Sequence, residues 1–295
     1  MDIRNILVPL DFSASSDQAF DYASFLADKF AAKLTLLNTI LSSEVGSNDE
    51  IDLLDYERIV KKIRKNKQAL LQEYVDKAMV KEIPVETVVT QGFSAGDSIL
   101  DFVKTGNFEL VVMGSRSGSS LIKWSLGSVA EKVIHASSIP VFTLHEPIEK
   151  LDIGKILIPV DFSTVARDAS NLALFLSKIF KSRIEYLHVV DNSTTLVHTG
   201  GVKLKASDQA VTDLQDRITE HLGLHLDGDA DKNIFFKVMN GKISEKIVEY
   251  ADKNKYDLIV MSTGEKSGFD YLQVGSHTNG VIRRAPCPVL TVNKT

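Results

Sequence analysis

The stretch RNILVPLDFS, residues 4–13, returns almost unchanged as GKILIPVDFS, residues 154–163. A second stretch, NFELVVMGSRSG from Asn107, returns as KYDLIVMSTGEK from Lys255. Between the two copies the offset changes only from 150 to 148 residues, so insertions and deletions are small. Self-similarity at a fixed long period indicates a duplicated structural unit.

A third repeat closes each copy. LGSVAEKVIHASSIPVFTL begins at Leu126 and VGSHTNGVIRRAPCPVLTV begins at Val274. The seam falls in the charged stretch HEPIEKLDI, residues 145–153. We therefore predict two tandem domains, residues 1–147 and 152–295.

Each copy alternates short apolar runs with helical patterns. ILVPL is short, apolar and rich in branched side chains, which is typical of a strand buried on both faces. The helix expected after it carries apolar residues at spacings of four, three and four, namely Ala19, Ala23, Leu26 and Phe30, and the second copy repeats them as Ala169, Ala173, Leu176 and Phe180. Ser13 or Ser16 is expected to cap this helix. This alternation predicts an α/β fold, with a doubly wound parallel sheet in each copy and helices on both sheet faces.

The third segment of each copy differs. Residues 50–80 predict one long charged helix, whose basic run Lys61–Lys67 we interpret as a solvated face. Residues 193–207 contain Gly200-Gly201 and precede a shorter predicted helix. The two insertions, 42–80 and 193–230, lie where lids and partner surfaces occur, and a plain surface excursion fits equally well.

Composition narrows the function classes. The 295 residues are 44% hydrophobic with a net charge of -5, which indicates a globular protein and argues against nucleic-acid binding. Long uncharged apolar runs are absent from the sequence, which predicts a cytoplasmic protein without membrane contact. The single cysteine, Cys287, excludes an internal disulfide and is expected to be a buried inert thiol.

Candidate ligand-binding residues follow the predicted strands. Open parallel sheets bind ligands outside the carboxyl ends of their strands, where the strand order reverses. Pro9 and Asp11, Thr39, Gly92 and Gly114 follow the first, second, third and fourth strands of the first copy. The loop from Gly114 and the helix predicted to begin near Gly127 and Ser128 offer backbone N–H groups to an anion.

Competing motifs are weaker. The sequence contains no G-x-x-x-x-G-K-[ST] loop, which argues against a P-loop ATPase. Residues 92–96, GFSAG, match the G-x-S-x-G nucleophile elbow, so an esterase using Ser94 with His135 or His145 is a third hypothesis. The matching stretch NGKISEK of the second copy lacks that serine, which favours a strand-to-helix turn.

Histidines give little sign of a metal site. His221 and His225 are four residues apart on a predicted helix and could share a metal, but no third ligand is evident, so we predict no metal site. His188 ends a predicted strand and is expected to be a hydrogen-bonded histidine near the ligand-binding edge of the sheet.

The repeats resemble the tandem universal stress proteins over essentially the whole chain. The resemblance rests on VPLDFS and IPVDFS, on VVMGSRSG, on LGSVAEKV and on the closing IPVF and CPVL. It implies a nucleotide-binding-like fold in each half, similar to adenine-nucleotide alpha hydrolases and Rossmann domains. It also implies that the closing strands VFTL and VLTV pair across the halves to form a pseudo-dimer within the chain.

The family's ATP-binding motif is Gly, two residues, Gly, nine residues, Gly and then Ser or Thr. The first half matches it at Gly114, Gly127 and Ser128, with Ser117 in place of the second glycine. The resemblance therefore implies an adenine nucleotide, ATP, ADP or AMP with or without Mg²⁺, held in the first half by Pro9, Asp11, Thr39, Met113, Gly114, Arg116, Ser117, Gly127, Ser128 and Val129.

The second half departs further from the motif. It matches at Gly275 and Ser276 and retains Asp161, but Ser262 and Glu265 replace the first two glycines. A carboxylate beside a triphosphate is repelled by its like charge. We expect this second site to be weaker or empty.

The hypothesis from sequence is a cytoplasmic stress-response protein that binds its nucleotide as a regulatory ligand. Because no general base or metal cluster is evident, we expect no catalytic residues and slow or absent turnover. A homodimer, formed through the closing strands or the insertions, is expected. The alternative is an interaction module with degenerate sites that binds no nucleotide, for which Ser117 and Glu265 speak.

Overall fold

The chain divides into two compact units, which are described one at a time. They are Asp2–Pro147, the first unit, and Ile148–Thr295, the second unit. The computed structural model describes residues 2–46, 52–115, 126–145, 150–160, 165–191, 233–263 and 276–293, and four positions between 212 and 220.

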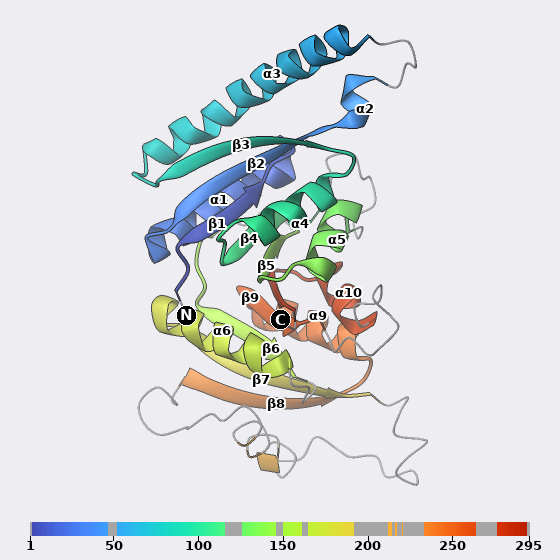
Figure 1. The fold of residues 1–295 in the computed structure, drawn as a ribbon. Helices are drawn as coiled ribbons and strands as arrows, with labels where there is room; N and C mark the ends of the chain where they lie inside the picture. Colours follow the sequence, from blue (N-terminus) through green and yellow to red (C-terminus); the bar gives the residue numbers. More distant parts are fainter. Residues whose placement is uncertain are drawn as a thin grey trace. The chain divides into compact units, whose positions relative to one another are not determined.

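The first unit contains a parallel sheet of five strands (Figure 1). The strands are β1 (Asn5–Pro9), β2 (Lys33–Leu41), β3 (Val85–Gly92), β4 (Leu110–Gly114) and β5 (Val141–Leu144). Their order is β3-β2-β1-β4-β5, so the order reverses between β1 and β4. Ile6 lies at the centre, paired with Leu34 on one side and Leu110 on the other.

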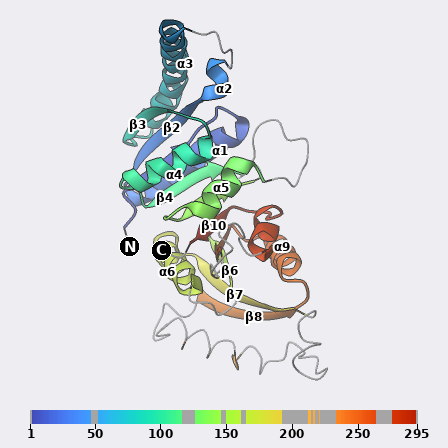
Figure 2. The same ribbon diagram turned by 45° about the vertical axis from the view of Figure 1, so that its right-hand side comes forward.

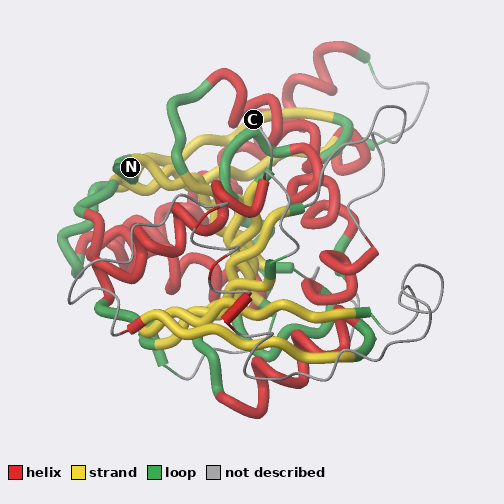
Figure 3. Tube along the Cα trace, turned by 90° about the horizontal axis from the view of Figure 1, so that it is seen from below, coloured by secondary structure: helices red, strands yellow, loops and turns green. Residues whose placement is uncertain are grey.

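Five helices accompany this sheet: α1 (Ala14–Phe30), α2 (Ser42–Val45), α3 (Leu53–Met79), α4 (Ala95–Thr105) and α5 (Ser128–Ala136). Right-handed crossovers place α1 and α3 on one face and α4 and α5 on the other. Figure 2 shows α3 along the outer edge, beside β3, and Figure 3 shows helices on either side of the strands. As predicted, Ser13 caps α1, with its side chain accepting from the Ser16 N–H.

The second unit repeats the same order. Its strands are β6 (Lys155–Pro159), β7 (Arg183–Val190), β8 (Ile234–Asn240), β9 (Leu258–Ser262) and β10 (Val289–Val292). All the neighbouring pairs are parallel, in the order β8-β7-β6-β9-β10. The described helices are α6 (Val165–Phe180), α9 (Ile243–Asn254) and α10 (Ser276–Ile282).

The predicted α/β class with parallel sheets is confirmed. The apolar runs form buried strands because both sheet faces are covered: Ile6, Leu7 and Val8 are fully buried in β1. The long charged helix expected over residues 50–80 is α3. Residues 193–207 lie outside the described part of the chain. Among the helices that are described, none is long and apolar enough to cross a membrane.

Candidate functional site

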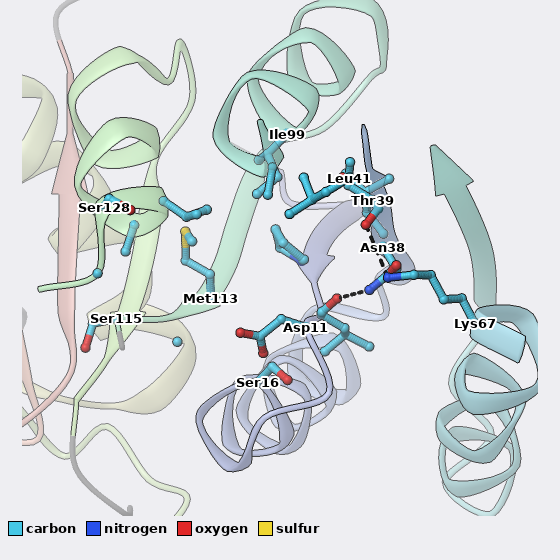
Figure 4. A pocket seen from close by; sticks show the side chains of 18 of the residues that line it. Asp11, Ser16, Asn38, Thr39, Leu41, Lys67, Ile99, Met113, Ser115 and Ser128 are labelled. Carbon is cyan, nitrogen blue, oxygen red and sulfur yellow. Dashed lines mark hydrogen bonds between the residues drawn. The ribbon is translucent and has the colours of Figure 1, made fainter. Parts of the chain in front are cut away.

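A cavity of about 360 Å³ opens in the first unit at the carboxyl ends of β1, β2 and β4 (Figure 4). It lies where the strand order reverses, the usual ligand position in open parallel sheets. Its size falls within the range of small-molecule pockets, about 300–1,000 Å³. Its lining comprises Pro9, Leu10, Asp11, Ser16, Leu37, Asn38, Thr39, Leu41, Glu44, Lys67, Ala95, Ile99, Met113, Gly114, Ser115, Gly127, Ser128, Val129 and Ala130.

Many of the residues expected from sequence meet at this cavity. It is lined by Pro9, Asp11, Thr39, Met113, Gly114, Gly127, Ser128 and Val129. Gly92 ends β3 beside Leu41 and is not among the lining residues. Ser276 opens α10 in the second unit. Four expected residues lie outside the described part of the chain: Arg116, Ser117, Asp161 and Gly275.

Asp11 is held in place by the turn that starts α1. The backbone N–H and hydroxyl of Ser13 both donate to Asp11 Oδ1, at 3.0 and 2.5 Å. Between them Phe12 adopts a left-handed conformation with φ of 63°. Such a backbone is costly for a non-glycine residue and often occurs at functional sites. The turn orients the carboxylate and leaves its second oxygen, Oδ2, able to accept from a ligand hydroxyl.

Gly114 lets the end of β4 press against the start of α1. A Cβ atom at this position would lie 2.8 Å from the carbonyl oxygen of Ser15, which is backbone and cannot swing away. A side chain at residue 114 would therefore push β4 and α1 apart at the edge of the cavity. The glycine serves close packing here, because no positive φ is recorded for it.

The start of α5 supplies the anion-binding groups of the cavity. Gly127 is the N-cap residue in extended backbone, with φ of -68°, and no side chain caps the helix. The Gly127 N–H donates to the carbonyl of Ser115 at 2.7 Å. The N–H of Gly127 is therefore engaged within the protein, and phosphate binding at Gly127 stays a prediction from sequence. The first-turn donors that lie beyond it belong to Ser128, Val129 and Ala130. These N–H groups and the positive end of the helix dipole favour an anion.

Apolar side chains form the walls between these polar groups. Leu10, Ile99, Met113 and Ala130 are buried and line the cavity from four different elements or their ends. A flat aromatic base is complementary to such walls, whereas the polar groups fix its orientation.

Asn38, Glu44 and Lys67 are among the lining residues that were not predicted from the sequence. Lys67 comes from α3, and its side chain is only 14% exposed. The solvated-face interpretation of Lys61–Lys67 is therefore wrong at two positions. Lys67 Nζ lies 3.0 Å from Glu44 Oε2 and 3.4 Å from the Thr39 carbonyl, and Arg64 donates to the Val89 carbonyl. The available signal was helical spacing, since Lys67 is in phase with buried Leu71, Tyr74 and Ala78.

Asn38 sits at the same end of the cavity as Lys67. Its Nδ2 donates to the Leu10 carbonyl at 2.6 Å, and the residue is 4% exposed. Its Oδ1 is buried and has no hydrogen-bond partner within the described part of the chain. Most buried polar atoms are paired, so this oxygen is an acceptor still to be satisfied.

Ser94 has a structural role as the N-cap of α4. Its hydroxyl accepts from the Asp97 N–H at 3.4 Å, and its carbonyl accepts from the Ser98 N–H at 3.1 Å. His145, one of the two histidines considered for an esterase, pairs through Nδ1 with the Ser115 hydroxyl. The G-x-S-x-G match is therefore a strand-to-helix turn in its geometry.

Other candidate groups are not assembled into a site. Within the described part of the chain, no three His, Cys, Asp or Glu side chains lie close enough together to share a metal. His221 and His225 lie outside the described residues, and His188 Nδ1 donates to the Val160 carbonyl at 2.9 Å. Cys287 is buried, and desolvation raises its pKa well above the usual thiol range, as expected for an inert thiol.

The universal stress protein family matches residues 2–145 and again residues 153–293. The chain belongs to this family. The double match also confirms the tandem resemblance expected from the repeats.

Universal stress protein Slr1230 of Synechocystis is 26% identical over 310 aligned residues, covering 98% of this chain and 99% of its own. Universal stress protein MJ0531 of Methanocaldococcus jannaschii is 32% identical over 143 residues, which cover 48% of this chain and 82% of its own. A universal stress protein of Archaeoglobus fulgidus has a similar solved structure, with a TM-score of 0.75 at 20% identity, covering 99% of this chain and 98% of its own. The shared fold thus extends over both units.

Proposed function

We propose that the first unit of this universal stress protein binds an adenine nucleotide as a regulatory ligand. One observation carries the proposal. A single cavity brings together an oriented carboxylate at Asp11, apolar walls, and the uncapped start of α5.

Each part of a nucleotide has a chemical counterpart in this cavity. Ile99 and Met113 offer apolar surface to the base, and Asp11 offers an acceptor to ribose hydroxyls. The α5 N–H groups favour the phosphates, to which Mg²⁺ would be bound if it accompanies the nucleotide. Ser128 opens α5 and adds a hydroxyl donor at the same end.

A regulatory role fits the groups present better than catalysis does. Asp11 is bound by Ser13, and among the described residues that line the cavity there is no histidine that could act as a general base. The nucleotide would then act by favouring one conformation over another. Homodimer formation and a cytoplasmic location stay predictions from sequence.

The test is calorimetric titration of the full chain with ATP, ADP and AMP. In Gly127→Glu a carboxylate at the start of α5 suits the helix dipole but repels phosphates, so binding should fall at least about tenfold without loss of folding. Gly127→Gln is the matched control, because it adds the same bulk without charge. Gly275→Glu places the same charge in the second half and should leave the first-unit site unchanged.

The alternative is an interaction module that binds no nucleotide. Absence of binding heat with all three nucleotides would support it and refute the proposal. Equal loss of affinity in Gly127→Glu and Gly127→Gln would refute the placement of the phosphates at α5. Loss of all binding in Gly275→Glu would move the site to the second unit.

A further inference from the structure

The end of the cavity farthest from α5 is built by the insertion between β2 and β3. Figure 4 places Ser128 at one end and Lys67, Thr39 and Asn38 at the other. Lys67 belongs to α3 and Glu44 to α2, and both helices lie in the segment between β2 and β3, whose sequence is not repeated in the second half. The cavity is therefore completed by a segment that differs between the two halves of the chain.

Lys67 is fixed in its position by packing and by charge. Leu71, Tyr74 and Ala78 are buried on the same stripe of α3, and the Tyr74 hydroxyl donates to Asp17 of α1. The Tyr74 ring packs edge-on to Phe20, with ring centroids 5.0 Å apart. These contacts anchor the helix that carries Lys67 to the body of the first unit.

The donors of Lys67 can be counted. An ammonium group has three N–H donors. Among the described residues, Nζ lies 3.0 and 3.1 Å from the two carboxylate oxygens of Glu44 and 3.4 Å from the Thr39 carbonyl. Glu44 is held in turn, because its Oε1 accepts from the Leu41 N–H at 2.9 Å. The contact with Thr39 is the longest of the three, so it is the one that an acceptor on a ligand can replace, at a side chain that also lines the cavity.

Acceptors lie beside this donor. Asn38 Oδ1 is buried without a partner in the described part of the chain, and the Glu44 carboxylate has lone pairs beyond those used. This end of the cavity therefore presents a cationic donor next to acceptors, whereas the other end presents the backbone donors of α5 and the Ser128 hydroxyl.

The orientation of a bound nucleotide follows from these two ends. Phosphates at α5 place the sugar on their side, so the edge of the base opposite its glycosidic bond points toward Lys67. In adenine that edge carries the N1 acceptor and the 6-amino donor. Guanine carries an N1–H donor at the same place, which would face the ammonium of Lys67.

We infer that Lys67 determines base specificity by donating to N1 of adenine, while Asn38 Oδ1 and Glu44 offer acceptors to the 6-amino group. The inference rests on the proposed function of the same cavity. It adds that a side chain of the α3 insertion, besides the backbone at Thr39, reads the base.

The experiment is a double-mutant cycle that removes the Lys67 ammonium from the protein and the N1 atom from the ligand, separately and together. Affinities of wild type and Lys67→Met are measured for ATP and for 1-deaza-ATP, in which carbon replaces N1. Wild type should bind 1-deaza-ATP about tenfold more weakly than ATP, the effect of one charge-assisted hydrogen bond. In Lys67→Met the two ligands should bind equally, because the donor is gone.

Lys65→Met is the matched control, since Lys65 is exposed on the same helix. It should keep the full difference between ATP and 1-deaza-ATP. The wild-type comparison alone needs no variant, so it tests the inference even if Lys67→Met does not fold.

Three results would overturn the inference. If wild type binds ATP and 1-deaza-ATP equally, or if Lys67→Met keeps the wild-type difference between them, Lys67 does not contact N1, and nucleotide binding itself is unaffected. Absence of binding of any nucleotide by wild type removes the proposed function and the inference with it.

Discussion

At equivalent places in the two sheets, the first unit carries Asn38 on β2 and the second carries His188 on β7. Each side chain donates to the carbonyl that follows the first strand, Asn38 to Leu10 at 2.6 Å and His188 to Val160 at 2.9 Å. Both side chains thus make the same hydrogen bond, although one is an amide and the other an imidazole. Asn38 places an amide oxygen acceptor where the second unit has an imidazole, and this difference bears on a ligand.

The loop after the fourth strand shows the same pattern. In the first unit the Ser115 hydroxyl pairs with His145, and in the second the Thr263 hydroxyl donates to Asn293. The position of Ala130, which lines the first-unit cavity, is taken in the second unit by Thr278, whose hydroxyl donates to the Ser262 carbonyl at 3.2 Å. The duplicated skeleton therefore tolerates different side chains where a ligand would be held.

Away from that edge the units differ by a coupled set of three residues. Glu185 on β7 is 5% exposed and accepts from the hydroxyls of Tyr250, at 2.7 Å, and Tyr256. The equivalent residues of the first unit carry no carboxylate and no phenol: they are Thr35, Phe102 and Phe108, and the two phenylalanine rings pack against each other. A buried carboxylate requires hydrogen-bond donors, so the three differences belong together.

The largest effect is expected from Gly114→Ser, which gives the first unit the serine that ends the equivalent strand β9, Ser262. Gly114→Ser should destabilise the first unit by about 3 kcal/mol, because the added side chain overlaps the backbone of Ser15. Denaturant unfolding followed by Trp124, the single tryptophan and part of the first unit, measures this. The reciprocal Ser262→Gly should change stability by less than about 1 kcal/mol. Equal effects would show that the units pack alike at this point.

Tyr256→Phe should cost the second unit about 1–3 kcal/mol, because it removes a donor from buried Glu185. The free energy of unfolding, followed by circular dichroism, measures the loss. Tyr56→Phe on the exposed side of the first unit is the control and should have little effect.

The triple change Glu185→Thr, Tyr250→Phe and Tyr256→Phe copies the first unit and should cost less than Tyr256→Phe alone. Both partners of each hydrogen bond are then removed together. A strictly additive triple variant would contradict the coupling.

Alkaline pH should weaken the same cluster. Desolvation, followed by the hydrogen bond to Glu185, raises the pKa of Tyr250 to about 12. Because the folded pKa lies above the unfolded value of about 10, the neutral phenol is favoured in the folded protein. Its contribution is complete below pH of about 10 and is lost as pH rises toward 12. Unfolding free energies measured across this window should fall less steeply in Tyr250→Phe than in wild type, and equal slopes would argue against it.

The smallest effect is expected at Cys287, which takes the place of Ile139 in the first unit. Cys287→Val should change stability by less than about 1.5 kcal/mol, because the site is apolar and only volume matters. Because burial raises the pKa of this thiol, 5,5′-dithiobis(2-nitrobenzoate) at pH of about 8 should label it only after unfolding. Rapid labelling of the folded protein would show an open position.

The strands and the carboxyl-end site were predictable because their signals are local. ILVPL and its repeat carry a buried-strand pattern. Asp11 lies two residues after the end of β1, and Gly114 is the last residue of β4. Parallel sheets bring such ends together, so residues far apart in sequence could be placed around one cavity.

Lys67 and Asn38 were not predictable in the same way. Lys67 lies in a run of charges that usually marks a solvated face, and only the packing of α3 against the sheet turns it inward. Asn38 lies inside an apolar strand, where sequence does not indicate which of its amide atoms is left unpaired. The sequence likewise does not indicate that the Gly127 N–H donates to the Ser115 carbonyl.

The anchoring of α3 makes it a lever. The helix has 27 residues, which corresponds to a rod about 40 Å long. Lys67 lies about 10 Å from the anchor at Tyr74, whereas Leu54, whose side chain is exposed, lies about 30 Å from it. If α3 turned as a rigid rod about Tyr74, Leu54 would move about three times as far as Lys67, against the hydrogen bonds that join Arg64 and Tyr56 to β3. A small shift of Lys67 would then become a larger displacement of the exposed end of α3.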